Sequence, residues 1–200
     1  MDFFNSEFFT SLITLGVGLI AWAVFRAQQK QTDRDSATLV YLQIRDAERR
    51  INDLKQQPQQ ELVVSSLTKQ IIGENNWDKF KGRLVKYFDA DEIELINNFY
   101  SRVISAESAR AECKAVFDES LNEKARQIQS KLIDNIYQNI DDKTEIARKR
   151  ELLINYASQE VFVFDPDAPK NKAFKELIHI TYVSPTPTGE KLKKLAKVRQ

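Results

Sequence analysis

The first pattern along the chain is an unbroken run of apolar positions near its beginning. Residues 8–25 read FFTSLITLGVGLIAWAVF, eighteen positions without a charged side chain. As a helix this run is about 27 Å long, close to the hydrocarbon thickness of a bilayer. Aromatic residues lie near both of its ends, where they favour the membrane interface. We therefore expect a transmembrane helix over residues 8–25, preceded by an extracytoplasmic segment over residues 1–7.

The charged residues beside this run indicate its orientation. The acidic residues Asp2 and Glu7 precede it, and the basic residues Arg26, Lys30 and Arg34 follow it. Basic flanks favour the cytoplasmic side of a membrane. The pattern predicts a single-pass protein of the inner (plasma) membrane with its N-terminus outside and its remaining residues in the cytoplasm.

A cleaved signal peptide is the main alternative to an anchor. Ala21, Trp22 and Ala23 have the small-x-small form of a cleavage site. A signal peptide begins with a basic region, however, and this chain begins with an acidic one. The sequence therefore favours an anchor that is retained.

After the apolar run, the pattern becomes that of a helix with one apolar side. No glycine or proline occurs between Gly18 and Pro58, so we expect the helix to continue over residues 26–57. The apolar positions recur at alternating intervals of three and four, at Ala37, Val40, Ile44, Ala47, Ile51 and Leu54. Two interpretations fit this seam: a coiled coil between copies of the chain, or an amphipathic helix that packs on its own domain.

The coiled-coil interpretation makes the chain a homo-oligomer. Its assembly contacts would be Val40, Ile44, Ala47, Ile51 and Leu54. Within the anchor, the small-xxx-small pairs Thr14/Gly18 and Ala23/Ala27 would let neighbouring helices approach closely.

Pro58 separates this helix from a cytosolic helical bundle that we expect over residues 59–164, because proline and glycine are almost absent there. Its helices are expected at 62–72, at 77–88 with Asn76 as the cap, from Asp89 or Asp91 toward Asp141, and at 144–160. A third helix of that length would reach about 70 Å, so we expect a break near 105–108 or 135–142.

The amino-acid composition changes over residues 165–200. Proline, β-branched and aromatic residues predict extended or β-like segments there, with a short helix at 172–178 between them. Residues 190–199 are expected to form a basic helix that contacts lipid or nucleic acid through Lys191, Lys193, Lys194, Lys197 and Arg199. The alternative is a solvated helix packed through its leucines. The fold class is thus mainly α, with a short irregular or β-like C-terminal segment.

Charge and chemistry exclude several classes of function. The net charge is +1, which makes nucleic acid an unlikely partner for the chain as a whole. Cys113 is the only cysteine and His179 the only histidine, so neither a disulfide nor a zinc shell can form within the chain. No Walker, GxGxxG or GxSxG motif occurs. We expect no catalytic residue, no metal and no cofactor.

One enzyme-like alternative stays open. A HEPN-type ribonuclease places histidine four to six residues after arginine, whereas His179 lies twenty-nine positions after Arg150. Asn155 stands at the histidine-like spacing, as in a degenerate, non-catalytic module that could bind RNA; an exposed basic helix turn explains the same residues. In plan alone, one anchor followed by a helical domain resembles small bacterial membrane proteins that accompany RNA-targeting CRISPR enzymes.

These observations predict a non-enzymatic membrane protein that self-associates through its anchor and juxtamembrane helix. An extension of that hypothesis is a membrane-perturbing or pore-forming effector in a stress or phage-defence response. The alternatives are a membrane-tethered enzyme using Arg148, Arg150 and Asn155 or His179, and a membrane scaffold for a cytosolic protein partner.

Overall fold

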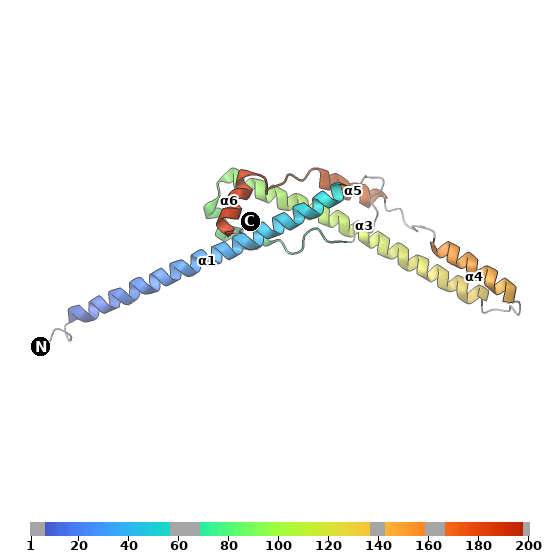
Figure 1. Cartoon of the computed structure of the whole chain (residues 1–200), viewed down its shortest axis with the longest axis horizontal. Helices are drawn as coiled ribbons and strands as arrows, with labels where there is room; N and C mark the ends of the chain where they lie inside the picture. Colours follow the sequence, from blue (N-terminus) through green and yellow to red (C-terminus); the bar gives the residue numbers. More distant parts are fainter. Residues whose placement is uncertain (1–6, 57–68, 137–142, 159–166, 198–200) are drawn as a thin grey trace. The chain divides into compact units, whose positions relative to one another are not determined.

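The chain is mainly helical, as the sequence predicts. A computed structural model describes residues 7–56, 69–136, 143–158 and 167–197, and within these ranges no residue is in a β-strand. The elements are α1 (Glu7–Lys55), α2 (Asn76–Leu84), the 3-10 helix η4 (Val85–Tyr87), α3 (Ala90–Ile136), α4 (Lys143–Ser158), α5 (Asp167–Ile178) and α6 (Pro187–Ala196) (Figure 1). Pro58 and the residues on both sides of it lie outside the described ranges.

The chain divides into two compact units built from non-consecutive segments. Unit 1 comprises Met1–Glu48, Glu74–Tyr100 and Thr181–Gln200, and unit 2 comprises Arg49–Gly73 and Ser101–Ile180. The long helices α1 and α3 each contribute residues to both units. The apolar N-terminal run and the helical seam up to Glu48 therefore belong to the same unit.

Helix α1 is a single element of 49 residues, which confirms that the N-terminal helix continues beyond its apolar run (Figure 1). No proline interrupts its hydrogen-bonding ladder. Four of its hydroxyl side chains are satisfied inside the helix, because each of them donates to a carbonyl oxygen one turn earlier. These bonds are Thr14 to Thr10 (2.9 Å), Thr32 to Gln28 (2.9 Å), Ser36 to Thr32 (2.8 Å) and Thr38 to Arg34 (2.8 Å).

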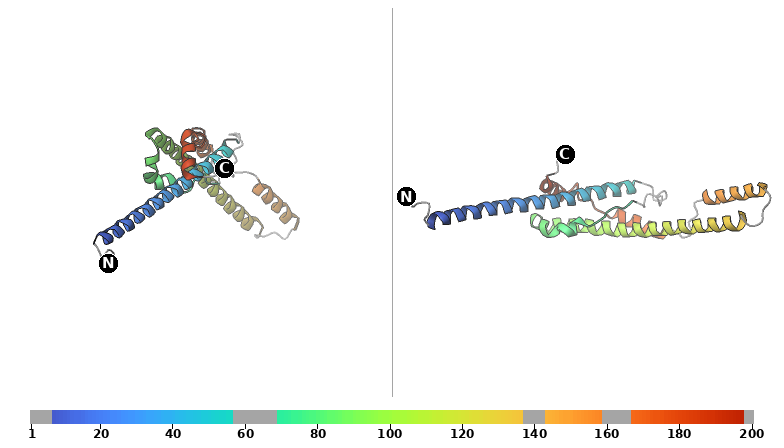
Figure 2. Two further views of the ribbon diagram at one scale, coloured as in Figure 1. Left: turned by 60° about the vertical axis from the view of Figure 1, so that its left-hand side comes forward. Right: turned by 90° about the horizontal axis from the view of Figure 1, so that it is seen from below.

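The core of unit 1 forms around the apolar side of α1. Aromatic and aliphatic side chains of α2, α3 and α6 are buried in the same unit, and in both views of Figure 2 α2 and α6 lie beside the middle of α1. The buried residues are Ala37, Val40, Tyr41, Ile44, Ala47, Trp77, Leu84, Phe88, Ile96, Phe99, Tyr100, Val183, Leu192 and Ala196. The seam therefore packs within its own chain.

Gln43 links α1 to the beginning of α2 and to α3. Its Oε1 accepts hydrogen bonds from the Tyr100 hydroxyl (3.0 Å) and the Asn76 backbone N–H (3.1 Å), and its Nε2 donates to the Glu74 carbonyl oxygen (2.5 Å). Burial raises the pKa of Tyr100, so its hydroxyl remains a protonated donor at neutral pH. A half-buried amide with both ends satisfied fixes the register of these helices.

A buried carboxylate holds the turn that leads into α6. Glu48 accepts hydrogen bonds from the backbone N–H groups of Val183 (2.6 Å) and Ser184 (2.9 Å) through one oxygen. The hydroxyl of Thr186 then caps α6 by accepting from the Gly189 N–H (3.2 Å), and Pro187 occupies the first turn of the helix. The C-terminal helix therefore begins three residues earlier than predicted, and residues 179–186 form irregular backbone and turns without a strand.

Gly189 is needed because α6 crosses the backbone of that turn closely. A Cβ atom on Gly189 would lie 2.2 Å from the Val183 carbonyl oxygen and 2.7 Å from Ser184 Cα. We expect Gly189→Ala to lower the free energy of unfolding by about 1–3 kcal/mol, because backbone cannot move aside as a side chain can. Gly82→Ala is the matched control: nothing lies within 4 Å of its added Cβ, and alanine should stabilise α2 by about 0.5–1 kcal/mol. Urea unfolding of both variants measures the difference, and equal stabilities would contradict this packing.

Unit 2 is organised around the middle of α3. Its buried residues are Ile51, Leu54, Ile71, Ile72, Val103, Ala106, Ala109, Cys113, Ala173, Leu177 and Ile180. Glu107 pairs with Arg110 (2.8 Å) and accepts a hydrogen bond from the Ile71 N–H (2.8 Å), while Lys172 of α5 pairs with Glu112 (3.0 Å). Burial raises the pKa of the Cys113 thiol, which keeps it protonated and poorly reactive.

Several predicted helix boundaries are corrected by the structure. Asn75 caps α2 in place of Asn76, because its side chain accepts from the Asp78 N–H (3.1 Å). The third helix has no break at 105–108 and ends at Ile136, at the second predicted position. The capping box between Asp89 and Glu92 confirms Asp89 as its start.

Two further predictions differ in extent. Helix α5 begins at Asp167 where the sequence predicts an extended segment up to residue 171, and Pro169 fits because it lies in the first turn. Residues 69–72 are not helical, and the rest of the helix expected at 62–72 lies outside the described residues. The fourth helix, α4, matches its predicted range closely.

Candidate functional site

The N-terminal part of α1 presents apolar side chains to its surroundings on all sides. Nine large apolar residues there are each more than half exposed: Leu12, Ile13, Leu15, Val17, Leu19, Ile20, Trp22, Val24 and Phe25. The most apolar eighteen-residue window has a mean hydropathy of 1.6, and none of it is buried inside the chain. By length and composition, α1 is therefore able to cross a membrane, whereas a core helix of a soluble protein would be covered.

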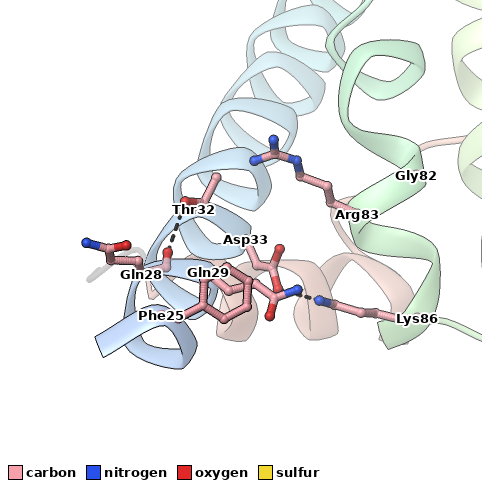
Figure 3. A pocket seen from close by; sticks show the side chains of 8 residues that line it. All are labelled: Phe25, Gln28, Gln29, Thr32, Asp33, Gly82, Arg83 and Lys86. Carbon is pink, nitrogen blue, oxygen red and sulfur yellow. Dashed lines mark hydrogen bonds and ion pairs between the residues drawn. The ribbon is translucent and has the colours of Figure 1, made fainter. Parts of the chain in front are cut away.

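A groove lies in unit 1 directly after this apolar surface. Its volume is about 530 Å³, and α1 and the end of α2 with η4 form its walls (Figure 3). The lining residues are Phe25, Gln28, Gln29, Thr32, Asp33, Gly82, Arg83 and Lys86. Because Phe25 is the last residue of the apolar run, the groove begins where the membrane-spanning surface would end.

Asp33 is the buried carboxylate of this groove, and it joins α1 to η4. Its side chain is only 4% exposed, and it accepts from the Lys86 ammonium group (2.7 Å) and the Tyr87 hydroxyl (2.7 Å). Burial alone would raise the pKa of Asp33, but the bonds from Lys86 and Tyr87 outweigh it and hold that pKa below its usual value. The hydrogen bond to the Asp33 carboxylate in turn raises the pKa of Lys86 above its usual value. Both groups are therefore charged at neutral pH.

Arg83 supplies a second positive charge, and it forms no ion pair with a carboxylate of the described residues. Its side chain is exposed at the groove, and it contributes electrostatically to the low pKa of Asp33. Within the described residues its guanidinium makes neither a hydrogen bond nor an ion pair closer than 4 Å. The lining therefore carries two cations and one carboxylate, and Gln28 and Gln29 line the same groove (Figure 3).

The residues predicted as assembly contacts are all buried within a single chain. Val40, Ile44, Ala47, Ile51 and Leu54 are at most 6% exposed. This burial favours the amphipathic-helix interpretation over the coiled coil. A contact between copies through these side chains would require them to leave their present neighbours, at the cost of the apolar surface that they cover.

The basic tail is folded onto unit 1 through its apolar residues. Leu192 and Ala196 are buried, and the Thr38 hydroxyl donates to the Ala196 carbonyl oxygen (3.1 Å). Lys191 pairs with Glu92 of α3 (2.5 Å) and lies over the Phe88 ring, and Lys193 reaches Glu190 (3.9 Å). Lys194 and Lys197 are exposed, and Arg199 lies outside the described residues. The structure thus favours the packed-helix alternative for this tail.

The residues of the enzyme alternative do not form a described constellation. Arg148, Arg150 and Asn155 are exposed on α4, and His179 is exposed in the turn after α5. Ile178 and His179 are both exposed, whereas Leu177 and Ile180 on either side of them are buried. Among the described residues, no group of three or more His, Cys, Asp and Glu side chains lies close enough to hold a metal ion.

The amino-acid sequence does not predict the groove, although it carries one signal for it. Asp33 lies four residues before Ala37, so it continues the alternating interval of the apolar seam. A carboxylate at a seam position is expected to be buried and paired. What the sequence does not reveal is its partner, because Lys86 and Tyr87 are more than fifty positions away.

Comparison of the chain with protein-family models, with curated proteins and with solved structures finds no match.

Proposed function

We propose that this chain is a non-enzymatic, single-pass membrane protein that serves as a scaffold at the cytoplasmic face. One observation supports this above all: the helix whose first part is exposed and apolar has its second part in the core of unit 1. The membrane anchor and the folded unit are thus one continuous element. Any partner bound by that unit is held at a fixed distance from the bilayer.

The orientation in this proposal follows from the charges around the anchor. Arg26 stacks on the Trp22 ring at 4.8 Å, an arrangement suited to the interface on the cytoplasmic side. Lys30, Arg34, Arg83 and Lys86 add positive charge after the anchor, whereas Asp2 and Glu7 lie before it. In this proposal the N-terminus is outside and the folded units are in the cytoplasm.

Self-association remains part of the proposal but uses the anchor. The residues of its Thr14/Gly18 and Ala23/Ala27 pairs are all exposed, and nothing lies within 4 Å of a Cβ placed on Gly18. Pore formation is left out of the proposal. A pore requires a polar lining, whereas the Thr14 hydroxyl already donates to the Thr10 carbonyl oxygen (2.9 Å).

Labelling of single cysteines tests the anchor and its orientation together. In a Cys113→Ala background, cysteine is placed at Glu7 or at the exposed Lys194, and intact and lysed cells are treated with a membrane-impermeant maleimide. We expect Glu7→Cys to be labelled in intact cells, Lys194→Cys only after lysis, and the protein to resist extraction by alkaline carbonate. Extraction into the soluble fraction, or labelling of Lys194→Cys in intact cells, would refute the proposal.

A further inference from the structure

We propose that the groove between α1 and the end of α2 binds the phosphate group of an anionic phospholipid of the cytoplasmic leaflet. The inference rests on the proposed function, because it requires residues 8–25 to lie in the bilayer. It adds a specific ligand site, formed by Phe25, Gln28, Gln29, Thr32, Arg83 and Lys86, to what would otherwise be only a tether.

The position of the groove along α1 matches the headgroup layer. Gln28 lies three residues and Thr32 seven residues after Phe25, which places them about 4–10 Å beyond the end of the apolar run. The polar layer of a bilayer extends roughly 5–8 Å beyond the hydrocarbon on each side. The groove therefore lies at the depth where lipid phosphates are found.

The charges of the groove favour an anion over a cation or a neutral group. Asp33 is already satisfied by Lys86 and Tyr87, so its carboxylate does not repel a ligand as a free one would. The guanidinium of Arg83 is exposed and makes no hydrogen bond or ion pair with the described residues, although its charge also acts on Asp33. Guanidinium offers a planar fork of N–H donors that matches two phosphate oxygens. Arg83 is thus the principal phosphate ligand of the proposed site.

The shape of the lining suits an amphiphile. Phe25 is 64% exposed at the membrane end of the groove, and the charged and amide side chains lie beyond it. A volume of about 530 Å³ exceeds what a phosphate ion alone requires and lies within the usual range of small-molecule sites. The glycerophosphate part of a lipid fits this division, with its acyl chains continuing along the exposed apolar side of α1.

The basic tail is a weaker candidate for the same ligand. Lys191 and Lys193 already pair with carboxylates of unit 1, at 2.5 and 3.9 Å. Binding of an anion there would first have to break those pairs. Arg83 needs no such exchange, which is why the groove is preferred.

Native mass spectrometry of the full chain in neutral detergent tests the site. Phosphatidylglycerol and phosphatidylcholine with identical acyl chains are added in turn, and the lipid retained per chain is measured. We expect about fivefold tighter retention of phosphatidylglycerol, an advantage that Arg83→Gln abolishes because it removes one surface cation. Lys81→Gln is the matched control: Lys81 lies on the same helix, pairs with Asp78 at 2.8 Å and does not line the groove.

A second variant predicts the opposite change. Asp33→Asn keeps the size of the side chain but releases Lys86 from its ion pair, so phosphatidylglycerol should bind several-fold more tightly than to the unmodified chain. Added inorganic phosphate distinguishes the source of the ligand. If inorganic phosphate binds without lipid and Arg83→Gln abolishes this binding, the source of the ligand is free phosphate. Recognition of a phosphate group by Arg83 then stands, and the lipid as its source is refuted.

Equal retention of the two lipids together with no effect of inorganic phosphate would overturn the inference, as would equal behaviour of Arg83→Gln and Lys81→Gln. These results are independent of the cysteine-labelling test. If the chain resists carbonate extraction but shows no preference for phosphatidylglycerol, the proposed function stands and the lipid site is refuted. If carbonate extracts the chain, the proposed function is refuted, whatever the groove binds in detergent.

Discussion

Replacing Ile44 by alanine should lower the free energy of unfolding of unit 1 by about 2–5 kcal/mol, without dependence on protein concentration. Ile44 is 1% exposed inside a single chain, and truncation would leave a cavity among the helices packed around it. Denaturant unfolding in detergent, followed by the fluorescence of the buried Trp77 in a Trp22→Phe background, measures this loss.

Leu42→Ala is the control for this experiment. Leu42 lies on the same helix two residues earlier but is 47% exposed, so its truncation should change stability by less than about 0.5 kcal/mol. The coiled-coil interpretation predicts a different result. If the seam joined copies of the chain, Ile44→Ala would lower the oligomeric mass, and its unfolding midpoint would rise with protein concentration.

Replacing Val17 by arginine should reduce membrane integration roughly a hundredfold. Val17 lies at the middle of the apolar run and is 62% exposed, so the change disturbs no packing inside the chain. An arginine at the centre of a transmembrane helix costs about 3 kcal/mol, and a run of this length cannot shift to avoid it. The fraction of the protein that resists carbonate extraction measures the effect.

Leu42→Arg places the same charge on an exposed position of the same helix beyond the membrane, so integration should be unchanged. The comparison separates the effect of charge inside the bilayer from any general effect on α1. Integration of Val17→Arg at the level of the unmodified chain would show that α1 does not cross the membrane.

The features predicted correctly from the sequence are those set by local patterning. The apolar run and the continuation of α1 follow from the lack of charge and then of proline, and the start of α3 follows from Asp89 and its capping geometry. The absence of a break near 105–108 was not predictable in this way. There Val103, Ala106 and Ala109 enter the core of unit 2, and tertiary burial stabilises a helix longer than local reasoning allows.

Contacts between residues that are distant in the sequence could not be predicted. Whether a helical seam packs against its own chain or against a second copy depends on residues that lie far away in the sequence. Here these include Trp77 of α2 and Leu192 of α6, which are buried in the same unit as the seam up to Glu48. The periodicity of the seam is the same in both cases. Likewise, the pairing of Asp33 with Lys86 depends on how α2 packs against α1, which no local pattern specifies.

Under the proposed function, the unbroken course of α1 connects the membrane anchor rigidly to unit 1. Its apolar run is about 27 Å long, a few ångströms shorter than an average hydrocarbon layer, so it matches thin membranes best with little tilt. Since no glycine, proline or loop separates this run from the core of unit 1, any tilt of the anchor turns that unit by the same angle. Local bilayer thickness would therefore set both the angle of unit 1 and the height of the Arg83 side chain above the acyl chains.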